Sequence, residues 1–231
     1  MTMQQHNQNN RISIQVGLSG YSFRISRGQE VLKSSEWLSS ERIFTTPEFQ
    51  RRYDEVDVSV FTPKVALVPS QFFAPANARQ ALAEVVNLEA DDSVEYVEVP
   101  HMAAHMVFSN TIGETLSRVI VETVRLTDGT KARLLPEMFY MLQCLNSLTE
   151  YNKILASYMD GTLYLVIAQG RSLLLCNTYQ APDFTTAQYF IFLAMKKLQL
   201  NPEVSVISFR TPLSEEDMMS LYRYFKSVET I

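Results

Sequence analysis

Two short glycine-containing turns are the places in this sequence where backbone amides could bind a phosphate. Ser19-Gly20 separates two alternating runs in ISIQVGLSGYSFRIS, residues 12–26, and Asp160-Gly161 separates two similar runs further along the chain. Glycine has no side chain, so backbone N–H groups can approach an anion closely at either turn. The same residues suit an ordinary β-hairpin, because Asp-Gly between alternating strands is typical of a two-residue type I′ turn. Whether this chain can be an ATPase depends on which role the turns have.

Other arrangements of reactive side chains give weaker signals. The run GLSGY has its second glycine one position too early for a Gly-x-Ser-x-Gly nucleophile motif. His101 and His105 could bind a metal with Glu98 on a helix, but the surrounding pattern predicts a strand and a loop, on which this spacing does not converge. Cys144 and Cys176 lack a metal-binding spacing, which indicates core positions in a reducing compartment. We therefore expect no hydrolase chemistry and no metal site.

The composition describes a globular protein without the features of a nucleic-acid-binding or membrane protein. Of 231 residues, 46% are hydrophobic and 19% are charged, which is enough apolar material for a sizeable core. The formal net charge is −5 and Lys and Arg are not clustered, so we expect no nucleic-acid partner. The most apolar run, residues 189–195, is too short for a membrane helix, and residues 1–10 contain no apolar signal core. We expect a cytoplasmic protein whose acidic run Asp91-Asp92 is a solvated loop.

The first part of the chain reads as a meander followed by mixed helices and strands. Residues 1–10 are polar and low in complexity, so we expect a disordered tail. The run VIVETV fits either the end of a helix or a strand, and both assignments stay open. The expected strands are 12–18, 21–26, 30–35, 56–63, 64–69, 93–99, 105–109 and a weak one at 130–135, and the expected helices are 47–54, 77–88, 113–123 and 136–148.

The opening pattern returns in residues 153–179, KILASYMDGTLYLVIAQGRSLLLCNTY, where two glycine turns again separate three strand-like runs. Aligning Gly161 with Gly20 puts Gly170 one residue out of step with Gly28, so the repeat has one inserted residue. A helix over 185–199, a strand over 203–209 and a helix opened by the capping box Ser214-x-x-Asp217 follow. The sequence therefore predicts a duplicated chain, with a first lobe at 11–149 and a second lobe at 150–231.

A three-strand meander that occurs twice, each time followed by helices and further strands, resembles the duplicated ribonuclease H-like fold of the actin and sugar-kinase superfamily. The chain is similar to an uncharacterised bacterial family of actin-like proteins, a domain-of-unknown-function family. SLLLCNTYQAPDFTTAQYFIFLAMKKLQLNPEVSV at 172–206, VALVPSQFF at 65–73 and LYRYFKSV at 221–228 carry this resemblance. More distantly, the layout resembles the actin-like cytoplasmic assembly proteins of pilus and secretion machines, which act by holding partners. The resemblance implies an α/β fold with two ribonuclease H-like lobes, each built on a mixed sheet.

The resemblance also says where an ATP-binding member of the superfamily would carry its phosphate loops. The first hairpin should contain Asp-x-Gly, but Gln15 stands at the aspartate position before Gly17, and a neutral amide is a weaker magnesium ligand. The second hairpin should contain a longer glycine-rich loop, and no glycine in this chain adjoins another as the adenosine site would require. The degenerate phosphate-loop positions are Gln15, Gly17, Ser19, Gly20, Asp160, Gly161 and Thr162.

These departures favour a non-catalytic interaction or scaffold protein on a degenerate actin-like fold, a pseudo-ATPase. We expect no catalytic residue, no cofactor and no metal, and we expect an unidentified protein partner without nucleic acid or membrane insertion. Self-association is left open. The alternative is a nucleotide-binding ATPase that uses the seven loop positions, and a third reading is a small-molecule sensor that uses the cleft between the lobes.

Overall fold

The computed structural model of this chain describes residues 9–110 and 114–231. The chain forms two compact units: unit 1 is Met1–Phe61 with Asn110–Pro136, and unit 2 is Thr62–Ser109 with Glu137–Ile231. This division differs from the predicted lobes 11–149 and 150–231, because residues 62–109 and 137–149 pack with the C-terminal part of the chain. Most of the predicted tail, residues 1–8, lies outside the described residues, and Asn10 is already the first residue of a strand.

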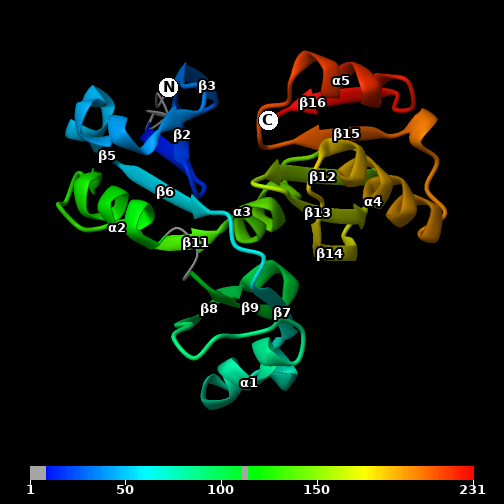
Figure 1. Cartoon of the computed structure of the whole chain (residues 1–231), viewed down its shortest axis with the longest axis horizontal. Coiled ribbons are helices and arrows are strands. Elements are labelled where there is room, and N and C mark those ends of the chain that lie inside the picture. The colour runs from blue at the N-terminus through cyan, green and yellow to red at the C-terminus, as the bar shows by residue number, and fades with distance from the viewer. Residues whose placement is uncertain (1–8, 111–113) are drawn as a thin grey trace, which may run out of the picture. The chain divides into compact units, whose positions relative to one another are not determined.

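Unit 1 contains a six-stranded sheet whose first three strands form the predicted antiparallel meander (Figure 1). The next two strands run parallel to the first, which gives the order β11-β6-β1-β2-β3. A short further strand pairs with the start of β2. The strands are β1 (Asn10–Val16), β2 (Gly20–Arg27), β3 (Glu30–Ser34), β4 (Leu38–Ser39), β6 (Glu55–Val60) and β11 (Leu134–Pro136).

The core of unit 1 lies on one face of this sheet. Alternation places Ile12, Ile14 and Val16 on that face, and all three are buried. Helix α2 (Glu114–Thr123) contributes Ile120 to the same core, so residues 114–123 are a helix, and Gly113 lies outside the described residues. A 3₁₀ helix (Ser40–Thr45) follows β4. The short strand β5 (Arg52–Tyr53) pairs in parallel with β10 (Arg125–Leu126).

The helix predicted over 47–54 is wrong beyond its first turn. Residues Pro47–Gln50 form a 3₁₀ helix, and Arg51 then adopts an extended backbone that leads into β5. The periodicity of this segment arises because Phe49 and Tyr53 are both buried in the core of unit 1. A single turn and a short strand bury the two rings, so no longer helix forms.

Unit 2 contains a five-stranded sheet with the order β14-β13-β12-β15-β16. The first three strands form an antiparallel meander, and β15 and β16 continue in parallel from β12, as β6 and β11 do from β1. This equivalence of order and direction confirms the predicted duplication of the fold. The strands are β12 (Asn152–Met159), β13 (Thr162–Gln169), β14 (Ser172–Gln180), β15 (Val206–Phe209) and β16 (Ser227–Thr230), the last of which the sequence analysis missed.

The two meanders also share an irregularity. The ladder between the second and third strands shifts register at Leu32 in unit 1 and at Leu174 in unit 2, each the third residue of its strand. The preceding turns both contain a glycine with positive φ, Gly28 at 59° and Gly170 at 55°. A β-bulge at the same place in both copies is a feature of the repeated unit.

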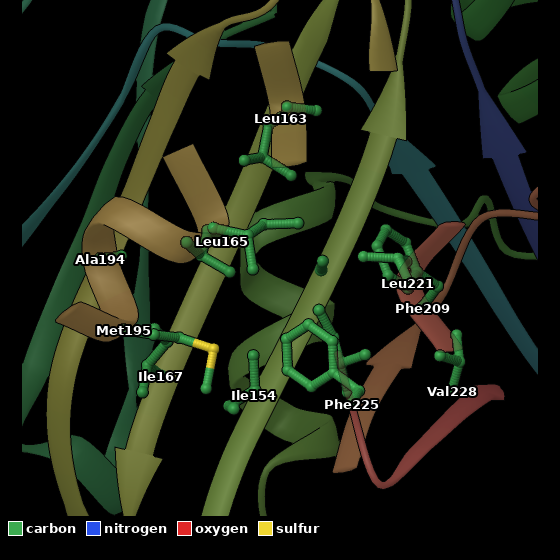
Figure 2. Packing of buried hydrophobic residues seen from close by; sticks show 14 of the residues in the cluster. Ile154, Leu163, Leu165, Ile167, Ala194, Met195, Phe209, Leu221, Phe225 and Val228 are labelled. Atoms are coloured by element: carbon green, nitrogen blue, oxygen red, sulfur yellow. The ribbon is translucent and has the colours of Figure 1, made fainter. Parts of the chain in front are cut away.

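Helices α4 (Phe184–Lys197) and α5 (Glu215–Tyr222) pack on one face of the unit 2 sheet. Figure 2 shows side chains of the core between them. Ile154, Leu165 and Ile167 from the sheet pack here with Met195 and Leu221 from the helices. The start predicted at Ser214 is confirmed, and the helix predicted over 185–199 begins one residue earlier, at Phe184. Asp183 caps α4 and Ser214 caps α5 through side chains that accept backbone N–H bonds. Helix α3 (Glu137–Cys144) contacts β12 and β13, and a 3₁₀ helix (Pro202–Val204) precedes β15.

Unit 2 also includes a small module, residues 62–109. Its antiparallel sheet has the order β7-β9-β8, built from β7 (Val65–Pro69), β9 (Ala104–Ser109) and β8 (Val94–Val99). Helix α1 (Ala78–Ala83) packs on this sheet through Leu82 and is shorter than the predicted helix over 77–88. Three 3₁₀ helices complete the module, at Ser70–Phe72, Pro75–Asn77 and Pro100–Met102.

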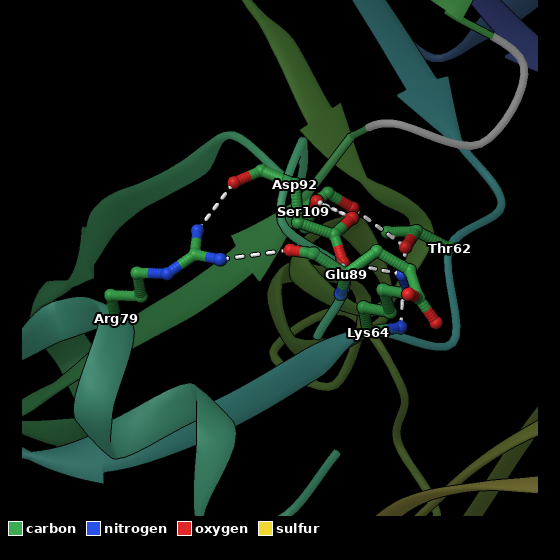
Figure 3. Close-up of polar contacts among 6 residues, drawn as sticks. All are labelled: Thr62, Lys64, Arg79, Glu89, Asp92 and Ser109. Atoms are coloured by element: carbon green, nitrogen blue, oxygen red, sulfur yellow. Dashed lines mark hydrogen bonds and ion pairs between the residues drawn. The ribbon is translucent and has the colours of Figure 1, made fainter. Parts of the chain in front are cut away.

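The acidic run Asp91-Asp92 was expected in solvent, and this is wrong for Asp92, which is buried and whose polar contacts Figure 3 shows. Its carboxylate accepts hydrogen bonds from Ser109 Oγ at 2.9 Å and from the Glu89 amide at 2.7 Å, and it pairs with Lys64. Arg79 donates to the Asp92 carbonyl at 2.6 Å. A buried carboxylate needs this kind of compensation, so Asp92 fixes the loop between α1 and β8.

Candidate functional site

The first candidate turn is hydrogen-bonded to β4. Val16 and Tyr21 pair across the hairpin, and the Gly17 amide donates to the Gly20 carbonyl at 3.0 Å. On the other side the Ser40 amide donates to the Ser19 carbonyl at 3.2 Å. A Cβ at Gly20 would lie 2.1 Å from the Leu38 carbonyl oxygen, a separation that real Cβ atoms essentially never show. Close packing against β4 therefore explains this glycine.

Gln15 lies in the middle of the unit 1 sheet, directly opposite Ser22 on β2 and Ser59 on β6. Its neighbours across both ladders are therefore neutral hydroxyl side chains. Successive side chains of β1 point to opposite faces of the sheet, so Arg11, Ser13 and Gln15 lie together on the face opposite the core.

A carboxylate that the sequence analysis missed lies on this polar face. Asp57 is opposite Ser13 on the parallel strand β6. Its carboxylate accepts hydrogen bonds from Arg11 Nε at 2.5 Å and from Ser13 Oγ at 3.2 Å. The alternation in EVDVSV would have placed Asp57 and Ser59 on one face. The carboxylate of Asp57 is thus engaged by a guanidinium within its own sheet.

The second candidate turn is the predicted two-residue type. Met159 and Thr162 pair directly, and the two residues between them have positive φ, 50° at Asp160 and 70° at Gly161. Both central residues of a type I′ turn need this conformation. The Gly161 carbonyl accepts from the Ala181 amide at 2.8 Å. A Cβ at Gly161 would meet only ordinary contacts at 3.7 Å, so the backbone conformation is what favours glycine here.

The candidate positions form two local groups. Gln15, Gly17, Ser19 and Gly20 lie along the β1–β2 hairpin of unit 1, and Asp160, Gly161 and Thr162 form the tight turn of unit 2. Within residues 9–110 and 114–231, no cluster of three or more His, Cys, Asp or Glu side chains is arranged to hold a metal. No helix in those ranges is long and apolar enough to span a bilayer.

The histidine pair is separated by a change of element. His105 lies on β9 opposite Glu98, whereas His101 lies in the 3₁₀ helix that follows β8. The His105 ring stacks on Phe73 with centroids 4.1 Å apart, and its Nδ1 lies 3.3 Å from Ser70 Oγ. His105 therefore belongs to the packing of the small module.

Unit 2 contains a buried ion pair that the sequence analysis did not predict. Arg210 Nε donates to Glu137 Oε1 at 2.9 Å, and Ser157 Oγ donates to the same oxygen at 2.8 Å. The Glu137 side chain is fully buried and that of Arg210 is 14% exposed. Arg210 also donates to Cys144 Sγ at 3.1 Å, and burial raises the pKa of the adjacent Tyr164 far above its ordinary value. No local pattern links residues 73 positions apart, so sequence reasoning could not pair them.

Helix α4, helix α5 and the segment after α5 present large apolar and aromatic side chains to solvent. Tyr189 is 60% exposed, Met219 62% and Tyr224 52%. Phe192 on α4 contacts the segment that follows α5, with its ring 5.0 Å from that of Tyr224 and 5.8 Å from that of Phe225. The helix predicted over 185–199 is thus covered on its inner side and open on its outer side. We call Tyr189, Phe192, Met219 and Tyr224 the aromatic surface.

Comparison with known proteins gives a family and a fold. A family model described as "Protein of unknown function (DUF3822)" matches residues 2–228, and no curated protein matches the chain. A solved Bacteroides thetaiotaomicron protein of unknown function with an actin-like ATPase fold is 15% identical, with a TM-score of 0.68 over 100% of this chain and 94% of that one. At this identity the likeness shows the fold alone, and it confirms the predicted actin-like fold class.

Two further solved structures come from assembly machines. The cytoplasmic domain of EpsL, an inner membrane component of the Vibrio cholerae type II secretion system, is 13% identical with a TM-score of 0.51, covering 89% of this chain and 84% of that one. A chain of the PilM–PilN type IV pilus biogenesis complex is 13% identical with a TM-score of 0.52, covering 96% and 88%. The predicted distant similarity to pilus and secretion assembly proteins is confirmed at the level of fold.

Proposed function

The chain belongs to the DUF3822 family of proteins of unknown function, and from this premise we propose that it is a non-catalytic interaction protein. It keeps an actin-like fold and has lost the chemistry of phosphate transfer. It functions by binding a protein partner.

The observation that carries this proposal is the tight turn at Asp160-Gly161. A phosphate cradle needs several backbone N–H groups that converge on the anion. Here β12 and β13 are joined by two residues, and the Gly161 carbonyl is bonded to Ala181. A turn of this length has no residues to spare for wrapping a phosphate chain.

The first hairpin supports the same proposal. Phosphoryl transfer depends on placing magnesium and hydrogen-bond donors around the developing charge. Gln15 offers no charge for a metal, and Asp57, on the same face, is engaged by Arg11. Gly20 is required by the approach of β4, so the glycine is no sign of a phosphate.

A protein partner is proposed from the solved relatives and from the surface of unit 2. One relative is a component of a secretion system and another is a chain of a two-protein pilus complex. The aromatic surface leaves large side chains in solvent on α4, on α5 and just after α5, and aromatic residues are enriched where proteins bind one another.

Steady-state phosphate release from magnesium ATP tests the catalytic half of the proposal. We expect release at buffer background for the wild type and also for Gln15→Asp, because one restored carboxylate does not lengthen the second turn. Turnover that disappears in Gly17→Val or in Asp160→Ala would establish the ATPase alternative instead.

Crosslinking and co-purification from the native cell test the partner half. We expect a specific protein to be captured by the wild type and lost with the double variant Tyr189→Ala/Tyr224→Ala. Phe72→Ala is the matched control, because Phe72 is 75% exposed but lies in the small module. Equal capture by the double variant would exclude the aromatic surface as the binding site.

A further inference from the structure

Unit 2 contains a cavity that the proposed function does not use. Its volume is about 820 Å³, within the range of roughly 300 to 1,000 Å³ typical of small-molecule sites. One wall comes from the small module, at positions 67, 69 and 100–104. The other comes from the residues just after α3, from β12, and from β13, β14 and the turn between them, at positions 145, 146, 153, 168, 170, 171 and 173.

The polar side chains of this cavity favour a negative charge. His101, Lys153 and Arg171 line it, and no Asp or Glu is among its lining residues. Lys153 Nζ donates to the Leu145 carbonyl at 2.6 Å, which uses one of the three donors of an ammonium group. Within the described part of the chain, the side chains of His101 and Arg171 make no hydrogen bond or ion pair. Their donors are therefore available to a ligand.

The rest of the lining is largely apolar. Leu67, Met102, Leu145 and Leu173 face the same cavity. Apolar walls with a few convergent polar groups are the usual composition of a ligand site, in which the walls bind the body and the polar groups fix the orientation. A methionine adapts its shape to different ligands more readily than other apolar side chains.

The backbone of one wall is strained. Ala103 adopts a left-handed conformation with φ 47° and ψ 46°, which is unfavourable for a residue with a Cβ. It is held there because its amide donates to the Pro100 carbonyl at 3.2 Å and its carbonyl accepts from the Ser70 amide at 2.8 Å. Strained backbone of this kind gathers at ligand sites, where surrounding contacts maintain it.

From the cationic side chains, the apolar lining and the strained backbone at Ala103, we infer that this cavity binds a carboxylate carried on an apolar body. The carboxylate accepts hydrogen bonds from Arg171, with Lys153 adding positive charge and His101 a ring N–H donor, and the apolar body contacts Met102 and Leu173. The source is either a free medium-chain carboxylic acid or the C-terminal carboxylate of a peptide with an apolar last residue. This inference goes beyond the proposed function and does not depend on whether ATP binds.

Calorimetry on the full chain tests the inference with four probes. Octanoate and N-acetyl-Leu-Leu carry the carboxylate, and octanamide and N-acetyl-Leu-Leu-amide are their neutral counterparts. We expect at least one acid to bind about tenfold or more tightly than its amide. Tighter binding of the dipeptide identifies a peptide terminus as the source, and tighter binding of octanoate identifies a free acid. No binding of either acid, or equal binding of acids and amides, overturns the inference.

Arg171→Glu tests the location, because Arg171 lies on an exposed turn where substitution leaves the fold intact. We expect this variant to weaken binding of the acid by about tenfold or more, while Arg223→Glu, the same charge change at the exposed end of α5, alters it less than about twofold. In methyl-labelled protein the Met102 signal should shift on titration and the Met219 signal should not. Equal effects of the two variants, or a shift at Met219 alone, contradict the assignment.

Discussion

Gly20→Ala is expected to destabilise unit 1, because the methyl group has no room. The added Cβ would lie 2.1 Å from the Leu38 carbonyl oxygen and 2.9 Å from Trp37 Nε1, against 3.4–4 Å for an ordinary contact. The Leu38 oxygen belongs to the backbone of β4, so no side-chain rotation relieves the overlap. Strand β4 must move away from the turn.

The magnitude follows from what this movement breaks. Overpacking of a tight site costs about 1 to 3 kcal/mol. Displacing β4 also loses its pairing with Gly20 and Tyr21 and the bond from the Ser40 amide to the Ser19 carbonyl, at about 1 kcal/mol per hydrogen bond. We therefore expect Gly20→Ala to lower the free energy of unfolding by about 2 to 5 kcal/mol.

Urea denaturation followed by the fluorescence of Trp37 measures this effect, since Trp37 is the only tryptophan and lies beside the turn. Gly28→Ala is the matched control in the same unit. Its φ is 59° but a Cβ there would meet nothing within 4 Å, so only about 1 kcal/mol of backbone strain is expected. A midpoint for Gly20→Ala equal to that of the control would refute the close-packing explanation of this glycine.

Three further substitutions test other parts of the structure. Glu137→Ala leaves Arg210 buried without its carboxylate and should cost about 3 to 5 kcal/mol by chemical denaturation, with a smaller loss when Arg210→Met is added. Gln199→Gly should stabilise unit 2 by roughly 0.5 to 1 kcal/mol in the same assay, because this residue follows α4 with φ 56°. The hydrogen bond from Lys33 lowers the pKa of Glu48 below 4.5, so Glu48 adds stability above that pH and loses it as the pH falls through the lowered value. Lys33→Met should therefore shift the urea midpoint at pH 7 but not at an acid pH where Glu48 is protonated in the folded protein, and an equal shift at both would contradict this.

The parts of the fold that sequence reasoning predicted well depend on local patterns. The two meanders follow from alternation and from glycine turns, and both lie within about thirty residues of chain. Strand β16 was missed because SVET has a single buried residue, Val228, and becomes a strand only by pairing in parallel with β15. The helix expected over 47–54 shows the converse error, in which two buried aromatic rings imitate a helical period.

The site was predictable to a similar extent. The type I′ turn at Asp160-Gly161 could be read from two residues, because it is a local conformation. The need for glycine at position 20 could not be predicted, because it depends on the approach of the Leu38 backbone, 18 residues further along the chain. The same limit applies to Asp92, whose cationic partner Lys64 lies 28 residues earlier. Long-range polar partners have no spacing rule, so the structure is needed to find them.

Calorimetric titration with ATP at millimolar magnesium tests the central claim, the loss of phosphate chemistry from an actin-like fold. We expect no affinity tighter than about 1 mM, which corresponds to roughly −4 kcal/mol. The tight turn and the neutral Gln15 are the physical reasons. Micromolar binding by the wild type that is lost in both Gly17→Val and Asp160→Ala would contradict the account and assign the two hairpins to a nucleotide site.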